Sequence, residues 1–519
     1  MQPQIPAELL DHIFSYLGEE SDLTSLRACA AVSEHLSHLA EPHLYHRLVL
    51  TNSEDSKRCL EFTPNEILDI FLAHPHLATY VRSVKLSLAS RRRVSHSDSG
   101  LVLVLPLLQH TESVELEYRT STVGLLSWES LSEEFRNAIL LLLLQSTIRE
   151  VGVYDINNFP LQIFDGPLSL TGLSFSGELF YAGVDLSHLG PARSQLKSLS
   201  LFTLHGVPME PIVWLCDSRT SPDLSQLTFL KAPITCDIDF RILPYILSAC
   251  AKSLEVLEIT AWPEAVNQLY EIQESRDSPL LSDKQDILPI FSSQPTSLEL
   301  VMGRPSSPGY KEFLLSIPSP FTLSCLSSLK HLKLELTVEI DVHGLRARGQ
   351  SNPVWWPSGH YSVPFGWLQM VLDDLSGIRR APLCDPCIAP ATLELLTLAL
   401  SFDLMLDMLS EVSWVPLATA LSSFSSAMPS LKKIVIEIGR RPDKRAAHHL
   451  RHRPESEKEK DMIVEVLEQD EHLRTLIEGG LLCIVRHAPK DYTLLPFSSP
   501  PQECVEKGVR PPYLLIPAE

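Results

Sequence analysis

The stretch SLEVLEI at residues 253–259 decides the fold, because close copies of it recur along the chain. They are QLKSLSL at 195–201, SLKHLKL at 328–334 and SLKKIVI at 430–436. Each copy carries apolar residues at three key positions. Two residues separate the first position from the second, and one residue separates the second from the third. The last two apolar residues alternate with polar ones, which is typical of a short β-strand with one face in a core. Related phrases begin at residues 81, 148, 170, 224 and 393.

The spacing of these phrases indicates a repeat. The middle apolar residues of five successive phrases are separated by 22, 26, 28 and 30 residues; they are Val151, Leu173, Leu199, Leu227 and Leu257. This spacing resembles that of leucine-rich repeats, in which a strand and a helix form each unit. Intervening segments such as 132–146, SEEFRNAILLLLLQS, have the length and apolar density of helices. A unit of this size cannot cover its own apolar face, so neighbouring units must stack.

We therefore expect an α/β protein in which residues 81–500 form an irregular leucine-rich-repeat-like solenoid, with parallel strands inside and helices outside. The Asn that usually follows the strand of such repeats is absent, because Leu204 and Trp262 occupy the corresponding positions. A generic α/β domain is the alternative. Three segments are expected to be insertions, at 264–296, 340–392 and 439–460. Residues 461–480 predict a closing helix, and residues 501–519 a C-terminal tail.

The N-terminal residues predict a separate helical unit. Leu9, Leu10, Ile13, Phe14 and Leu17 form one apolar face of a helix. Pro6 suits the first turn of that helix, where a missing N–H costs nothing. Asp22 is a natural N-cap for a second helix, and a third short helix carries Leu36 and Leu39. Three helices in about 40 residues are too few to bury all their apolar surface alone.

The order of residues in this unit resembles an F-box. The resemblance rests on Ile5-Pro6-x-Glu8-Leu9-Leu10-x-x-Ile13-Phe14-x-Tyr16-Leu17 and on Asp22-Leu23-x-x-Leu26-x-x-Cys29-x-x-Val32-Ser33. The continuation Leu39-Ala40-x-Pro42-x-Leu44-Tyr45 is similar to fungal F-box-like domains, whereas His35 stands where many members carry Trp or another large apolar residue. We assign residues 1–50 to this domain and residues 51–80 to a helical linker. An ordinary helical cap is the alternative.

The resemblance implies that the chain docks a Skp-type adaptor and joins a cullin-based ubiquitin ligase. It implies adaptor contact by the exposed members of one set: Pro6, Leu9, Leu10, Ile13, Phe14, Leu17, Leu23, Leu26 and Val32. The expected function is that of the substrate-receptor subunit, which holds a target protein on the repeats. The alternative is an interaction scaffold outside any ligase, whose F-box-like helices only cap the repeats.

Aromatic residues in the second insertion are candidate target-binding residues. They are Trp355, Trp356, Tyr361, Phe365 and Trp367, on a stretch rich in Pro and Gly. Aromatic side chains of this kind dominate many protein interfaces. The alternative is that they fill the inside of a long insertion. The strands would also present polar residues on one face, among them Lys85, Ser87, Glu255 and Glu258.

Composition excludes several functional classes. The formal net charge of −21 disfavours nucleic acid and anionic membranes as partners. Ten cysteines without a regular framework, and an N-terminus without the features of a secretory signal, predict a reducing compartment, cytoplasmic or nuclear. No phosphate loop, nucleophile elbow or zinc-protease motif occurs, so we expect no intrinsic catalysis and no cofactor.

Two further motifs have ordinary explanations. Cys384 and Cys387 have the spacing of half a zinc site, but no second half follows, so two free thiols are expected. The basic run 440–453 contains His448, His449 and His452 among arginines that would repel a metal. It resembles a nuclear-import cluster, although such runs are common in solvated loops.

Overall fold

The computed structural model describes residues 5–19, 22–51, 62–89, 100–119, 126–165, 169–176, 179–180, 194–201, 222–234, 246–261, 326–339, 392–403, 414–438 and 457–486, with a few single residues between them. Contacts divide the chain into two compact units. One contains residues 1–46 and 490–519, and the other contains residues 47–489. Their described parts are called here the helical unit and the sheet unit.

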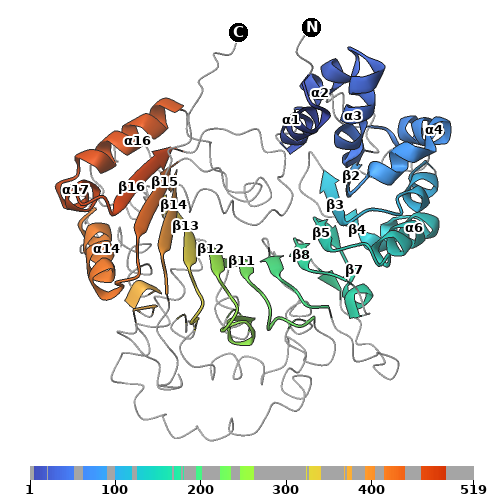
Figure 1. The fold of residues 1–519 in the computed structure, drawn as a ribbon. Helices are drawn as coiled ribbons and strands as arrows, with labels where there is room; N and C mark the ends of the chain where they lie inside the picture. Colours follow the sequence, from blue (N-terminus) through green and yellow to red (C-terminus); the bar gives the residue numbers. More distant parts are fainter. Residues whose placement is uncertain are drawn as a thin grey trace, which may run out of the picture. The chain divides into compact units, whose positions relative to one another are not determined.

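Three helices form the helical unit: α1 (Ala7–Glu19), α2 (Leu23–Ala30) and α3 (Glu34–Tyr45) (Figure 1). Each pair of these helices is in contact. The bounds confirm the three helices that the sequence predicts, with Asp22 as the N-cap of α2.

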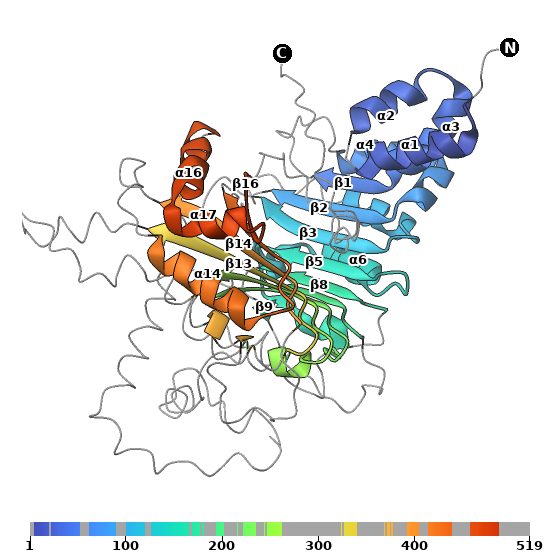
Figure 2. The same cartoon turned by 60° about the vertical axis from the view of Figure 1, so that its left-hand side comes forward.

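Twelve strands of the described chain form one parallel sheet in sequence order, and Figure 2 shows them side by side. They are β1 (Arg47–Thr51), β2 (Ser83–Ala89), β3 (Ser113–Arg119), β5 (Glu150–Tyr154), β8 (Gly172–Phe175), β10 (Ser198–Leu201), β11 (Phe229–Ile234), β12 (Val256–Ala261), β13 (His331–Glu339), β14 (Leu395–Asp403), β15 (Lys433–Ile438) and β16 (Leu482–Arg486). The sheet is open, with β1 and β16 as its first and last strands. Two further sheets pair β4 (Leu126–Ser127) with β6 (Ile156–Asn157) and β7 (Phe159–Pro160) with β9 (Leu179–Phe180).

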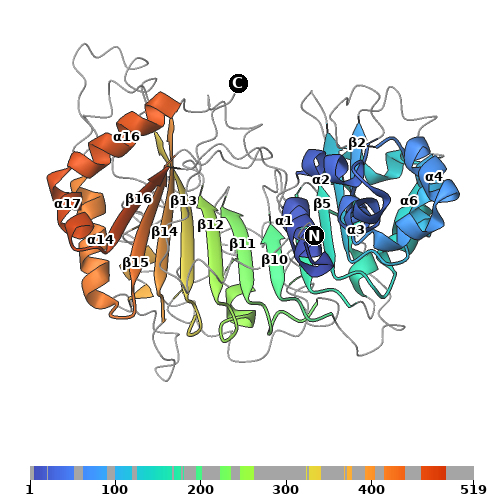
Figure 3. The same cartoon turned by 45° about the horizontal axis from the view of Figure 1, so that its top comes forward.

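Helices accompany both halves of this sheet, as Figures 1 and 3 show. The first half carries α4 (Pro64–Ala73), η1 (Pro75–Tyr80), η3 (Leu105–Leu107), η4 (Trp128–Ser130), α6 (Glu133–Leu143) and η5 (Leu161–Asp165). The last strands are accompanied by α14 (Val415–Ala427), α16 (Glu457–Gln469) and α17 (Glu471–Glu478). No helix in the described ranges is both long enough and apolar enough to cross a membrane.

Strand register explains why the recurring phrase produces a sheet. One row of paired residues is apolar in every one of the twelve strands: Leu48, Val84, Val114, Val151, Leu173, Leu199, Leu230, Leu257, Leu332, Leu396, Ile434 and Leu482. All twelve side chains are at most 3% exposed. A slip of one residue would turn this row to the opposite face, so burial of the row determines the register of each strand.

The structure corrects the predicted pattern at three places. In β11 the residue in line with Leu199 and Leu257 is Leu230, whereas the sequence predicts Leu227. The prediction is wrong because leucines at both positions fit the same spacing. Leu227 lies in the turn before the strand, where its N–H donates a hydrogen bond to Leu224 O. The predicted closing helix is divided at Asp470, which caps α17, and the strand β16 follows it. Arg47–Thr51 forms the first strand of the sheet, whereas the sequence places residues 47–50 in the F-box-like domain and Thr51 in the helical linker.

The apolar row makes a quantitative prediction about stability. Leu332 is fully buried in β13, whereas Leu141 on α6 is 67% exposed. Leu332→Ala should lower the free energy of unfolding by about 2–5 kcal/mol, because it removes buried methyl groups and leaves a cavity. Leu141→Ala should change it by less than about 0.5 kcal/mol. Urea midpoints followed by circular dichroism would measure both, and equal losses would contradict the assigned register.

Candidate functional site

The helical unit has a small core of its own. Phe14, Leu26 and Ala40, one from each helix, are at most 2% exposed. Partly buried apolar residues pack around them: Leu17, Leu23, Cys29, Ala30, Leu36, Leu39 and Leu44. This core joins the three helices and determines which side of α1 remains outside.

Side-chain caps define where the second and third helices begin. Asp22 Oδ1 accepts a hydrogen bond from Ser25 N at 3.0 Å, and Asp22 Oδ2 accepts one from Ser25 Oγ at 2.6 Å. The Ser25 hydroxyl, followed by its N–H, holds the pKa of the Asp22 carboxyl below its usual range. Ser33 Oγ accepts from Leu36 N and caps α3 in the same way.

A polar contact between α1 and α3 fixes the rotation of α1. His43 Nε2 lies 2.8 Å from Asp11 Oδ1, and the His43 and Phe14 rings form a T-shaped pair with a centroid distance of 6.5 Å. Asp11 lies on the same helix as Leu9 and Ile13, between them in sequence. The contact therefore holds the outer face of α1 in one orientation relative to α3.

That outer face of α1 is apolar and exposed. Leu9, Ile13 and Tyr16 are 51%, 41% and 60% exposed, and their spacing of i, i+4 and i+7 places them on one side of the helix. Ile5 before the helix and Val32 after α2 are also exposed. The residues Ile5, Leu9, Ile13, Tyr16 and Val32 are called here the exposed apolar set. Large exposed apolar side chains that gather in a unit this small mark a surface for protein contact.

The structure separates the nine predicted adaptor residues by burial. Pro6, Leu9, Ile13 and Val32 are exposed; Leu10, Leu17 and Leu23 are half-buried; Phe14 and Leu26 belong to the core. Sequence reasoning omitted Ile5 and Tyr16 from the set. The helical periodicity from Leu9 and Ile13 could have identified Tyr16. The predicted aromatic residues at 355–367, the Cys384–Cys387 pair and the histidines at 448–452 lie outside the described residues.

A second candidate surface is the polar face of the sheet, opposite the apolar row. Lys85 Nζ lies 2.6 Å from Glu115 Oε1 and 2.7 Å from Glu117 Oε2. Lys85 and Ser87 share this face with Glu258, as predicted. Glu255 does not, since it lies before β12, where it pairs with Lys330 at 2.9 Å.

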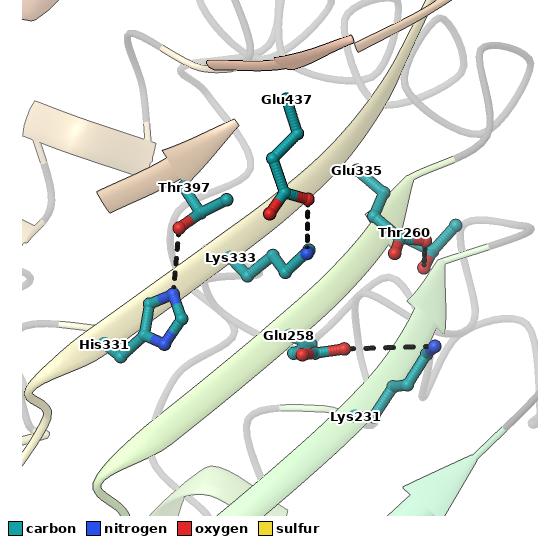
Figure 4. Close-up of polar contacts among 8 residues, drawn as sticks. All are labelled: Lys231, Glu258, Thr260, His331, Lys333, Glu335, Thr397 and Glu437. Atoms are coloured by element: carbon teal, nitrogen blue, oxygen red, sulfur yellow. Dashed lines mark hydrogen bonds and ion pairs between the residues drawn. The ribbon is translucent and has the colours of Figure 1, made fainter. Parts of the chain in front are cut away.

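The same face continues over β11–β15, where Figure 4 shows its polar contacts. Lys333 Nζ lies 2.6 Å from Glu437 Oε2, across the intervening strand β14. His331 Nε2 and Thr397 Oγ1 share a hydrogen bond of 3.0 Å, and Thr260 Oγ1 donates one to Glu335 at 2.6 Å. These contacts join side chains that are 66 to 104 residues apart in the sequence, so no local pattern indicates them.

Burial shifts the pKa of three groups on this face. It lowers the pKa of His331, with Lys333 acting in the same direction and Glu258 and Glu437 opposing it. Burial also raises the pKa of Glu150 and lowers that of Arg47. Within the described residues, no group of three His, Cys, Asp or Glu side chains could hold a metal ion. Lys85, Lys333 and Thr397 on this face are buried, and the two lysines pair with glutamates of nearby strands.

Comparison with known proteins identifies the helical unit. Residues 3–51 match the family model described as F-box-like. The match covers the three helices and β1, and it contains the whole exposed apolar set. F-box domains are generally non-catalytic and typically bind Skp-type adaptors, so the N-terminal part of this chain has a role in protein interaction. No curated protein matches the chain.

The Asp22 cap predicts a dependence of stability on pH. Because the pKa of Asp22 is lower in the folded unit than in the unfolded chain, its stabilising effect is present above the unfolded value of about 3.9. It is lost as the pH falls through the folded value. Asp22→Asn should therefore reduce the loss of α-helical signal in acid. Circular dichroism from about pH 6 to about pH 2 would compare the helical signal of the variant with that of the unchanged chain. Identical profiles for the two would contradict the assigned cap.

The Lys85 ion pairs predict that replacing Lys85 destabilises the fold, and that replacing its two glutamate partners as well restores most of the stability. Lys85→Met should lower the free energy of unfolding by about 3–5 kcal/mol, because Glu115 and Glu117 would lose their buried counter-charge. Adding Glu115→Gln and Glu117→Gln should recover most of that loss. The matched control is Lys432→Met, whose partner Glu394 is at 2.7 Å but whose side chain is 70% exposed. The control should cost about 0–1 kcal/mol, and a Lys85 effect of that size would contradict the account.

Proposed function

We propose that this protein is the substrate-receptor subunit of a Skp–cullin–F-box ubiquitin ligase. The exposure of Leu9, Ile13 and Tyr16 on one side of α1, within the F-box-like match, carries the proposal. A folded unit that leaves these side chains in solvent has apolar surface available to an adaptor. Such a subunit would act in the cytoplasm or nucleus.

The proposed mechanism needs no bond-making chemistry from this chain. The helical unit would bind the adaptor, and through it the cullin complex, while the sheet unit would bind the target protein. The target lysine would then be held near a ubiquitin-loaded enzyme, which raises the effective concentration of the reacting groups. The division of the chain into two compact units supports this division of tasks.

We further propose that the sheet unit is an irregular leucine-rich-repeat-like array. Its strands pair in sequence order, and each carries one residue of the same apolar row. Each added strand therefore extends one core. The aromatic residues Trp355, Trp356, Tyr361, Phe365 and Trp367 remain proposed target contacts.

The second candidate is an interaction scaffold that joins no ligase. It would require the helical unit to serve as a cap whose apolar surface is used within the chain. The match of residues 3–51 to the F-box-like family model favours the receptor over this scaffold.

Adaptor binding tests the proposal. Leu9→Asp/Ile13→Asp places two carboxylates on the exposed face of α1 and leaves the Phe14 core intact. Each buried anchor of an interface is worth about 2 kcal/mol or more, so binding to a purified Skp-type adaptor should weaken by about 100-fold or more. Isothermal titration calorimetry with the full-length chain would measure the change.

The matched control is Met462→Asp on α16, which changes an apolar residue of similar exposure, 39%, in the sheet unit. Its adaptor affinity should equal that of the unchanged chain. Phe14→Asp would be a poor test, because it would disrupt the core of the helical unit. An unchanged chain that does not bind the adaptor would leave the scaffold as the function.

A further inference from the structure

Three helical segments in the first half of the sheet unit lie side by side. They are α4, the helical segment 100–107 that ends in η3, and α6, which follow β1, β2 and β3. A methyl group on Gly100 would lie 2.5 Å from Asn65 Oδ1 and 2.9 Å from Pro64 Cβ, so segment 100–107 begins against the first turn of α4. At its other end, η3 contacts α6.

These segments carry exposed leucines on their outer side. The five leucines are called here the leucine strip. They are Leu72 on α4 (67% exposed), Leu103 and Leu107 on segment 100–107 (58% and 37%), and Leu141 and Leu144 at the end of α6 (67% and 53%). These five leucines do not belong to the buried core. Other residues of the same segments, such as Phe71, Leu105 and Phe135, are buried beneath them. An exposed apolar strip over three adjacent segments is a feature of contact surfaces.

The two borders of the strip differ in charge. Each segment follows a parallel strand and leads to the next one, so the three N-terminal ends lie on one side and the C-terminal ends on the other. Exposed carboxylates lie on the N-terminal side: Glu66 and Asp69 on α4, and Glu133 and Glu134 on α6. The C-terminal side has His74, His76, His110 and Arg149, while Arg82 there faces Glu112 at 3.8 Å.

We propose that the leucine strip binds an amphipathic helix of another protein, with leucine-like residues on its apolar side and Lys or Arg along one border. The four carboxylates complement such a border. A second copy of this chain fits less well, because four carboxylates would meet one arginine and three histidines across a two-fold axis, between chains of net charge −21. An anionic membrane would be repelled by the same carboxylates. The strip lies in the sheet unit and is distinct from the exposed apolar set of the helical unit.

A peptide selection tests the strip without knowledge of the natural partner. The probe is a library of helical peptides with leucine fixed at i, i+3, i+4 and i+7 and all flanking positions free. The target is the full-length chain carrying Leu9→Asp/Ile13→Asp, so that the helical unit contributes no apolar site. Selected peptides should be enriched in Lys and Arg along one border. They should bind at least about tenfold more weakly (~1.4 kcal/mol) when the target also carries Leu103→Ser, Leu141→Ser and Leu144→Ser.

Two control variants distinguish binding at the leucine strip from binding to exposed apolar residues elsewhere on the chain. Val415→Ser/Met462→Ser removes exposed apolar residues from α14 and α16 and should leave peptide binding unchanged. Asp69→Lys/Glu134→Lys keeps every leucine and should change the selected border from basic to acidic. This second variant also decides the outcome if the serine variant loses its fold by circular dichroism.

Four results would overturn the proposal. They are an absence of Lys and Arg enrichment, equal binding to the serine variant, self-association in sedimentation that the serine variant abolishes, and binding to phosphatidylserine vesicles that it abolishes. The third result would assign the strip to a second copy of the chain, and the fourth to a membrane surface.

Discussion

Burial of one row of apolar side chains across twelve parallel strands is the constraint on which the sheet unit depends. The row runs from Leu48 to Leu482, and each of its members pairs with its neighbour in the next strand. Because side chains alternate along a strand, burial of this row also determines which residues face the other way. The ion pairs of Lys85 and Lys333 on the polar face are consequences of the register that the leucines impose.

The helical unit follows the opposite principle, since it leaves apolar surface outside. Its core of Phe14, Leu26 and Ala40 is small, and the contact of His43 with Asp11 holds α1 in place. Leu9, Ile13 and Tyr16 therefore remain in solvent in a folded unit. Exposed apolar surface has a cost in solubility, and the proposed adaptor would offset that cost by covering it.

The recurring phrase predicts nine of the twelve strands, and apolar periodicity predicts the three N-terminal helices, because both depend on local patterns; β1, β3 and β16 lie outside the quoted phrases. The sequence assigns Leu227 in place of Leu230 because leucines spaced three apart fit the same pattern twice. It cannot separate Phe14 from Ile13, since both lie on the apolar side of α1 and only packing against α2 and α3 distinguishes them. The contact of Lys333 with Glu437 joins residues 104 positions apart, and no local pattern indicates it.

Hydrogen–deuterium exchange of the full-length chain, with and without a purified Skp-type adaptor, tests the central claim most directly. The account predicts that the adaptor slows exchange in α1 and around Val32, where the exposed apolar set lies, and leaves α14, α16 and α17 unchanged. Unchanged exchange throughout α1 at a saturating adaptor concentration would contradict it. The F-box-like helices would then serve a purpose other than adaptor binding.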